Sequence, residues 1–270
     1  MGGKPVNKVI RKVKRAILRD DPDYYDMYEN PGEQYYARLY LHRIGGYLKK
    51  IGDPKELRLL DAGCQAGRLA IPLAQAGHRV TGVDTSDLAL RRARRHAEAQ
   101  GVAIEWIRAN LTDWLPKQAA GGFDAVLSAE VLYQRENHRE LLRQMIRLLK
   151  PGGLCFISHP SRNRYLNEAL GRGDTEAARL IQTRGEGILW GSYYNWQDRP
   201  TLTAWYEALG MEQLFISPIG FYSWLSVNPE KLDAAGRELL FEADNAMGSD
   251  FDGGRYLLVC ATKRLGGDDK

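Results

Sequence analysis

Two carboxylates and two glycines between residues 57 and 84 have the types and spacing of a ligand site. Asp61 ends the apolar stretch LRLLD, Gly63 and Gly67 follow it, and an apolar helical pattern then runs to Gly77. Glycines let the backbone turn sharply and let a ligand approach without an intervening side chain. In open parallel sheets, such turns lie at the carboxyl ends of strands, where ligands bind. The segment therefore predicts a cofactor loop.

The same spacing excludes two common nucleotide loops. A phosphate-binding P-loop ends in Gly-Lys-Ser/Thr, and the segment GCQAGRLA has no such ending. A dinucleotide fingerprint needs glycines at relative positions 1, 3 and 6. Starting at Gly63, the latter two positions hold Gln65 and Arg68. The loop therefore requires another cofactor.

Strand and helix patterns alternate around this loop. Short apolar runs predict strands at residues 57–63, 78–84, 103–109, 123–130 and 154–160, and helical periodicity predicts helices at 68–77, 86–101 and 137–153. Ser86 is a suitable N-cap, and Gly77 and Gly101 are suitable ends. The fold class expected is α/β, with a Rossmann-like parallel sheet and helices on both faces.

Segments outside this alternation divide the chain further. Residues 1–50 are predicted to form a basic helix and helices of an N-terminal lid, and residues 51–270 the main domain. Residues 160–200 read as irregular and polar. Residues 201–219 read as a helix and a strand, and 255–263 as a last strand. Insertions are placed at about 160–200 and 220–254, the second being a long loop that is either functional or disordered.

Five segments, in order and in register, resemble the motifs of class I S-adenosylmethionine (SAM)-dependent methyltransferases over roughly residues 55–160. They are LLDAGCQAG, VTGVDTS, IRANLTDWLP, FDAVLSAEVLYQ and LLRQMIRLLKPGGLCFIS. The resemblance implies SAM as cofactor, S-adenosylhomocysteine (SAH) as product and a final antiparallel strand. It implies that Asp84 binds the ribose hydroxyls and that the segment at Asn110 and Leu111 reads the adenine. The cofactor-binding residues expected are Asp61, Gly63, Cys64, Gln65, Gly67, Asp84, Thr85, Asn110, Leu111, Ala129, Glu130, Tyr25 and Tyr36; no metal is expected.

Two residues depart from the family pattern. Gln65 stands in place of the middle glycine, and Asn110 stands where aspartate is more usual. Because Gln65 carries a Cβ, we expect its backbone to avoid positive φ, with its amide either pointing outward or bonded to the methionine end of the cofactor. Asn110 retains a side-chain oxygen that pairs with an adenine amino group.

The fourth motif, SAEVLY, indicates the class of molecule that accepts the methyl group. The stretch SAEVLY lacks the Asn/Asp-Pro-Pro-Tyr/Phe of enzymes that methylate nucleobase amines, and its form resembles small-molecule methyltransferases. Three catalytic candidates follow. Glu130 would orient an amine or accept a proton, unless it is only a helix-start carboxylate; Tyr133 would line the pocket or simply pack; His159 is the general-base candidate for a hydroxyl acceptor, unless it is structural.

Aromatic residues gather in three segments that this fold brings to one edge of the sheet. Two readings stay open: an aromatic-walled acceptor pocket for a hydrophobic or planar small molecule, or a small core that supports the insertions. The residues are Tyr24, Tyr25, Tyr28, Tyr35, Tyr36, Trp190, Tyr193, Tyr194, Trp196, Phe221, Tyr222 and Trp224.

Charge and composition set the remaining expectations. Residues 1–19 hold seven cations and no acid, which leaves 31 basic against 34 acidic residues in the body. We therefore expect no nucleic-acid partner, and a membrane or acidic-protein contact through residues 4–19 stands beside a plain packing helix. Three scattered cysteines and the lack of a long apolar run predict a cytoplasmic protein. Oligomeric state is not predicted.

The function expected is methyl transfer to a small molecule. Two alternatives remain: a protein methyltransferase that modifies lysine or a similar residue, and a SAM- or SAH-binding regulatory or scaffold protein without turnover.

Overall fold

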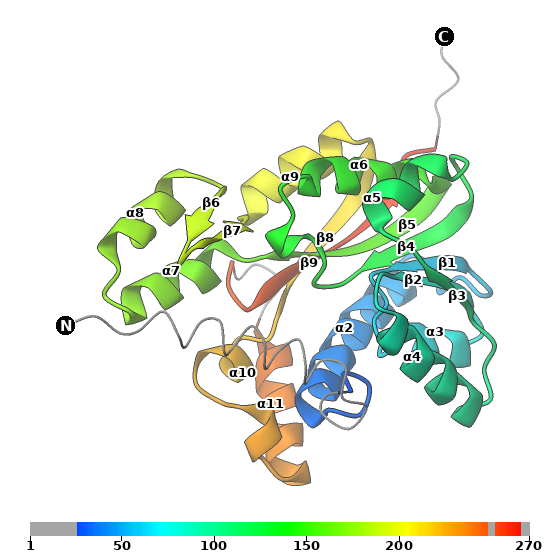
Figure 1. Cartoon of the computed structure of the whole chain (residues 1–270), viewed down its shortest axis with the longest axis horizontal. Helices are drawn as coiled ribbons and strands as arrows, with labels where there is room; N and C mark the ends of the chain where they lie inside the picture. The colour runs from blue at the N-terminus through cyan, green and yellow to red at the C-terminus, as the bar shows by residue number, and fades with distance from the viewer. Residues whose placement is uncertain (1–25, 248–251, 266–270) are drawn as a thin grey trace.

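The computed structural model describes residues 26–247 and 252–265, and a seven-stranded sheet organises them (Figure 1). The strands are β1 (Arg58–Ala62), β2 (Arg79–Asp84), β3 (Glu105–Arg108), β4 (Phe123–Ser128), β5 (Leu149–Pro160), β8 (Met211–Ile219) and β9 (Tyr256–Lys263). Their order is β3-β2-β1-β4-β5-β9-β8. Neighbours from β3 to β5 pair in parallel, whereas β9 runs antiparallel to both β5 and β8. The predicted parallel sheet with a final antiparallel strand is confirmed.

Helices cover both faces of this sheet, as expected (Figure 1). On one face lie α2 (Pro31–Lys50), α3 (Ala70–Gln75) and α4 (Asp87–Ala99); on the other lie α5 (Leu111–Trp114), α6 (His138–Arg147) and α9 (Arg199–Ala208). Each face has its own apolar core, the first shared by α2, α3 and the sheet and the second by α5, α6, α9 and the sheet. Burial of these two cores holds the strand ends in fixed positions.

Local sequence signals explain where the helices near the loop begin. The side chain of Asn30 accepts a hydrogen bond from the Glu33 amide, and Pro31 takes the first helical position of α2. Ser86 caps α4 in the same way, through the Ala89 amide. Helix α3 begins only at Ala70, later than the predicted residue 68, because the turn that contains Gly67 occupies the intervening residues.

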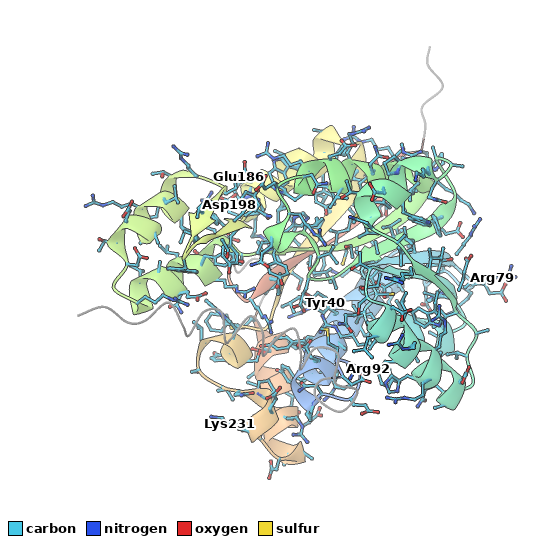
Figure 2. The ribbon with its side chains drawn as sticks, viewed as in Figure 1. Tyr40, Arg79, Arg92, Glu186, Asp198 and Lys231 are labelled. Atoms are coloured by element: carbon cyan, nitrogen blue, oxygen red, sulfur yellow. The ribbon has the colours of Figure 1, made fainter. Side chains whose placement is uncertain are left out.

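The N-terminal helix α2 packs directly on the sheet. Its Tyr40 is fully buried near the centre of the molecule (Figure 2), and its apolar residues belong to the first core. The residues of α2 share this core with β1 and β9. The predicted domain boundary at residue 50 stays a prediction. The predicted basic helix lies outside the described residues. Within residues 26–247 and 252–265, no helix is long and apolar enough to cross a membrane.

Both insertions contain regular structure, contrary to expectation. Residues 160–200, expected to be irregular, include α7 (Arg162–Gly171), α8 (Thr175–Thr183) and the hairpin of β6 (Glu186–Leu189) and β7 (Ser192–Asn195). The segment expected to be a long loop includes α10 (Tyr222–Leu225) and α11 (Ala234–Ala246). The polar composition of residues 160–200 did not indicate these helices, because α7 and α8 bury alanines and aromatic rings rather than a long aliphatic stripe.

Candidate functional site

A cavity of about 570 Å³ opens at the carboxyl ends of β1, β2 and β4. This is the edge at which parallel sheets bind ligands. Most of the predicted site residues line it: Asp61, Gly63, Cys64, Gln65, Asp84, Thr85, Leu111, Ala129, Glu130 and Tyr133. The structure therefore brings together residues that are up to 72 positions apart, Asp61 and Tyr133.

Both glycines of the loop adopt backbone conformations that favour glycine. Gly63 has φ +91° and Gly67 has φ +87°. A Cβ on Gly63 would lie 2.2 Å from Cγ2 of Val131, so the loop after β1 packs against the loop after β4 only without a side chain there. A Cβ on Gly67 would lie 3.0 Å from the Trp106 ring. These contacts fix the path of the loop around the cavity.

The expectation for the Gln65 backbone is wrong, because its φ is +50°. This left-handed conformation costs a residue with a Cβ roughly 1–2 kcal/mol. It turns the Gln65 amide toward the end of β2, where it donates a 3.0 Å hydrogen bond to Oδ2 of Asp84. Gln65 therefore uses its backbone to join the loop to Asp84, in a conformation that glycine would adopt without strain.

Asp84 is held in place by two backbone amides. Oδ2 accepts from Gln65 and Oδ1 accepts from Ser86, at 2.8 Å. A carboxylate oxygen accepts two hydrogen bonds, so each oxygen retains one acceptor position. Since Asp84 lines the cavity, two neighbouring acceptors are available to a ligand that donates from a pair of hydroxyls.

Asp61 is a buried carboxyl group on the cavity wall. It is 2% exposed, and no described residue makes a hydrogen bond to its side chain. Burial raises the pKa of Asp61 to about 7; the positive charge of Arg68 opposes this shift, and Asp84 adds to it. A cation or a hydrogen-bond donor beside this group would stabilise its ionised form.

We predict that Asn replacement of Asp61 changes how stability depends on pH. The folded chain keeps the Asp61 proton up to a pH near 7, whereas the unfolded chain loses it near 4. The contribution of Asp61 to the free energy of unfolding therefore falls as pH rises from 4 to 7. Urea unfolding should show D61N gaining at least about 1 kcal/mol relative to wild type between pH 4 and pH 8. A difference that does not change with pH would contradict this.

A buried ion cluster forms one wall of the cavity. Arg68 donates to Oε2 of Glu33 at 2.6 Å and to Oε1 of Glu130 at 2.8 Å, and the side chains of all three are at most 13% exposed. Arg255 approaches the other Glu130 oxygen at 3.7 Å. Burial alone would raise the pKa of Glu130, but Arg68 and Arg255 hold it below its usual range. The raised pKa on which proton acceptance by Glu130 would depend is therefore not found, and a catalytic role for Glu130 stays a prediction.

Glu130 is held in this cluster by its backbone as well. Its φ is +60°, and its amide donates a 2.7 Å hydrogen bond to Oγ of Ser158. It precedes no α-helix directly, since the short 3₁₀ turn Leu132–Gln134 follows it. The reading of Glu130 as a helix-start carboxylate is therefore wrong. Backbone strain of this kind often gathers at functional sites.

The prediction that His159 is a general base is also wrong. Its side chain is fully buried, it does not line the cavity, and Nε2 lies 2.9 Å from the Tyr206 hydroxyl. Burial lowers the pKa of His159 to about 3. His159 is a core residue of β5 that packs against Tyr206 of α9.

Other predicted cofactor contacts lie outside the cavity wall. Asn110 is exposed, and its side-chain oxygen caps α5 by accepting from the Thr112 amide. Tyr36 is buried beside Arg255, and its hydroxyl donates to the Ser223 carbonyl oxygen. Gly67 does not line the cavity and packs against Ile71 and Trp106. Tyr25 and Tyr24 lie outside the described residues.

The aromatic insertion forms a small core, not a pocket wall. Trp196 is fully buried, and its indole N–H donates to the Ile181 carbonyl oxygen at 3.1 Å. Trp190 and Tyr194 pack on Tyr165 of α7, at ring distances of 6.5 and 5.2 Å. Among the described aromatic residues of the three aromatic segments, none lines the cavity, and its aromatic wall comes from Tyr133 and Tyr256.

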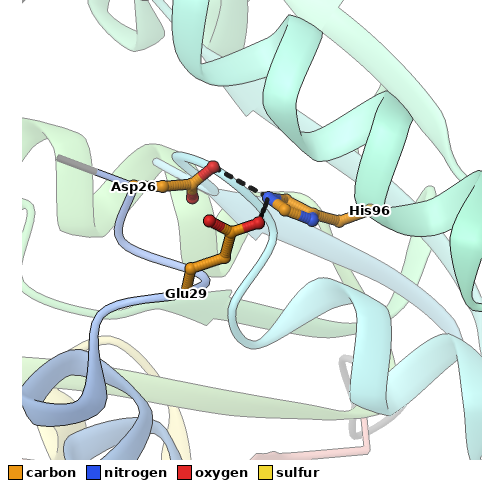
Figure 3. A group of neighbouring side chains, drawn as sticks. All are labelled: Asp26, Glu29 and His96. Atoms are coloured by element: carbon orange, nitrogen blue, oxygen red, sulfur yellow. Dashed lines mark hydrogen bonds and ion pairs between the residues drawn. The ribbon is translucent and has the colours of Figure 1, made fainter. Parts of the chain in front are cut away.

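A second group of ionisable residues joins the N-terminal segment to α4 (Figure 3). Nε2 of His96 lies 2.8 Å from Asp26 and 3.9 Å from Glu29. Two guanidinium groups approach the same Asp26 oxygen, Arg92 at 3.6 Å and Arg95 at 3.4 Å. Because these cations already neutralise the carboxylate, the group has the chemistry of a salt-bridge contact rather than of a metal site. Met27 and Glu33, which follow Asp26 in the chain, line the cavity.

Sequence reasoning missed the cations of the site. Arg68, Arg164 and Arg255 all line the cavity. Arg68 follows Gly67 directly, and Arg255 precedes the last strand, so their positions next to strand and loop ends were the available signals. Arg164 lies in the segment that was read as irregular, and nothing in its local pattern marked it.

Three comparisons with known proteins bear on this site. Residues 59–153 match the family model described as "Methyltransferase domain". A ubiquinone biosynthesis O-methyltransferase from Caulobacter vibrioides is 40% identical over 106 residues, which are 39% of this chain and 42% of that protein. One from Methylocella silvestris is 44% identical over 106 residues, 39% of this chain and 41% of that protein. The chain thus spans less than half the length of these curated relatives.

Solved structures with the same fold cover nearly the whole chain. Magnesium protoporphyrin IX methyltransferase from Synechocystis, solved with SAH, has a TM-score of 0.59 at 16% identity and covers 95% of this chain and 99% of its own. The 1,6-didemethyltoxoflavin-N1-methyltransferase from Burkholderia thailandensis has a TM-score of 0.56 at 16% identity and covers 98% and 92%. Residues 59–153 of this chain are therefore a match to a methyltransferase domain, and the chain has the fold of these solved methyltransferases.

Proposed function

We propose that this chain binds SAM and transfers its methyl group to a small-molecule acceptor, with SAH as the product. The observation that supports this most is the cavity at the ends of β1, β2 and β4, in which Asp61 and Asp84 offer carboxylates next to the Gly63 turn. The matched relatives are named O-methyltransferases, so an oxygen is the first acceptor atom to test. Three buried, free cysteines support the proposed cytoplasmic location.

The residues present fit the cofactor. The free acceptor positions on Asp84 suit the two ribose hydroxyls, and the unpaired carboxyl of Asp61 suits the ammonium group of the methionine end. Leu111 and Ala109 provide apolar wall for the adenine ring, beyond Asp84. Asn110 is occupied as a helix cap, so we assign adenine recognition to the backbone and apolar groups next to it.

When bound, SAM supplies an electrophilic methyl group on a sulfonium centre. The chain contributes position and electrostatics: an acceptor held at the right distance and angle reacts far faster than one in solution. Glu130, kept ionised by Arg68 and Arg255, presents a fixed negative charge to the cavity. Tyr133 is the hydroxyl-bearing side chain on the wall that we propose contacts the acceptor.

Gln65 provides a test of the loop. We predict that Q65G binds SAH within about threefold of wild type, because the backbone amide rather than the side chain holds Asp84. Relief of roughly 1–2 kcal/mol of left-handed strain is partly offset by the entropy cost of glycine, about 0.5–1 kcal/mol. Calorimetry and urea unfolding measure both effects.

Q65P is the matched control, because proline has no N–H and cannot adopt positive φ. It should lose SAH binding. If Q65G itself bound SAH tenfold more weakly, the side-chain amide would be a cofactor contact, and the assignment to the backbone would be wrong.

Turnover separates the proposed enzyme from its two alternatives. The chain is incubated with methyl-labelled SAM and pools of small hydroxylated and amine-bearing compounds, with cell protein as a separate arm. Label in the small-molecule fraction supports the proposal. Label only in protein indicates a protein methyltransferase, and SAH binding without transfer in either arm indicates a non-catalytic binding protein; each of these two results would overturn it.

A further inference from the structure

The cavity extends past the cofactor residues to a wall of arginines and tyrosines. Arg164 comes from the start of α7, and Arg255 and Tyr256 come from the start of β9. Tyr133 faces Tyr256 edge-on, with ring centroids 6.5 Å apart. This end of the cavity lies next to Glu130, on the side away from Asp61 and Asp84 in the chain's strand order β2-β1-β4-β5-β9. It is the end left for the acceptor.

The ion pairs at this end involve two of its arginines. Arg68 bridges Glu33 and Glu130, and Arg255 shares Glu130. Among the described residues, no carboxylate forms a salt bridge with Arg164. Arg164 is therefore a lining arginine whose charge no ion pair offsets.

Two of the guanidinium nitrogens of Arg164 have no hydrogen-bond partner, although its guanidinium also interacts with the Tyr256 side chain. Its Nε and Nη1 are buried without a hydrogen-bond acceptor. Its guanidinium carbon lies 5.2 Å from the ring centroid of Tyr165 and 5.1 Å from that of Tyr256. A half-buried guanidinium without an ion-pair partner carries a desolvation cost that aromatic stacking offsets only in part.

We propose that the methyl acceptor carries a carboxylate or phosphate group that Arg164 binds, with Arg255 beside it and a planar body of the acceptor against Tyr133 and Tyr256. A planar anion fits the forked donors of arginine through paired hydrogen bonds, which lysine cannot reproduce. That the bound anion is the methyl acceptor rests on the proposed function, but anion binding itself is measurable without turnover.

Binding of matched fluorinated probes tests the anion site. Fluorine NMR follows 4-fluorobenzoate, 4-fluorophenyl phosphate and the neutral 4-fluorobenzamide, each with and without saturating SAH. We expect at least one anion to bind ten times or more tightly than the amide. The benzoate and phosphate arms distinguish a carboxylate from a phosphate acceptor.

The variants R164M and R172M locate that binding. R164M should weaken the preferred anion at least tenfold and change SAH affinity by less than about twofold. R172M is the control, because Arg172 stands just after α7 on the ring of Trp190, is half-exposed and does not line the cavity. It should change neither affinity.

Two results would overturn the inference: anions that bind no better than the amide to wild type, or anions that bind R164M as tightly as wild type. The first needs no variant, so a poorly folded R164M does not decide the test. If anion binding depends on Arg164 while SAH does not bind, the anion site stands and the proposed function fails. If SAH binds and the anions do not, the proposed function stands and the anion site fails.

Discussion

Replacing Arg68 with methionine is expected to lower the free energy of unfolding by about 3–5 kcal/mol, the usual cost of removing one partner from a buried ion group. Arg68 is 5% exposed and is the shared partner of Glu33 and Glu130. Without it, two carboxylates stay buried at the cavity wall, and Glu130 keeps only the weaker interactions with Arg255 and Arg164. Urea unfolding at pH 7 measures the loss.

Two further variants make this result specific. R91M removes an exposed guanidinium paired with Asp87 and should cost less than about 1 kcal/mol. The triple variant R68M/E33Q/E130Q removes the unpaired charges together and should recover part of the stability lost in R68M. If R68M cost less than about 1 kcal/mol, the cluster would not be a buried network in solution.

Replacing Asp84 with asparagine is expected to weaken SAH binding at least a hundredfold. In the native loop both oxygens accept backbone hydrogen bonds, from Gln65 and Ser86. An asparagine would place its amide donor against one of these donors, which both breaks the loop contact and removes one ligand acceptor. Charge-assisted hydrogen bonds are worth roughly 1.5–3 kcal/mol each, and two such losses give the predicted factor. Calorimetry with SAH measures it.

D87N is the matched control for this variant. Asp87 lies three residues further on, in the first turn of α4, and its side chain is 45% exposed. It does not line the cavity, so D87N should bind SAH as wild type does. If D84N bound SAH within about twofold of wild type, Asp84 would not be the ribose contact.

The alternating core of the fold is readable from sequence because each element there has a one-sided apolar pattern. The predicted strand at residues 78–84 and helix at 86–101 agree closely with β2 and α4, whose ends are marked by Ser86 and by glycine. The insertions lack that pattern. The helix α8 buries alanines, and the hairpin of β6 and β7 is stabilised by Trp196 from outside it. Such contacts depend on tertiary packing, which local periodicity does not encode.

One half of the cavity wall was predictable for a similar reason. Asp61, Gly63 and Asp84 lie directly at the ends of β1 and β2, so strand order alone brings them together. The backbone conformation of Gln65 was not predictable, because its positive φ accompanies a hydrogen bond to a residue 19 positions away. The end of the cavity that we propose for the acceptor includes residues of α7 and of the start of β9, which reach the cavity through the three-dimensional arrangement of the chain. His159 shows the converse, since a strand-end histidine turned out to face the core.

Calorimetry of the chain with SAH, with NAD⁺ as the comparison ligand, tests the central claim most directly. We predict one SAH site per chain, with a dissociation constant in the micromolar range or below and no NAD⁺ binding, because the loop of Gly63 and Gly67 has no third glycine and Asp84 suits a ribose diol. A chain that binds NAD⁺ and not SAH, or neither, would contradict the assignment of this cavity to SAM.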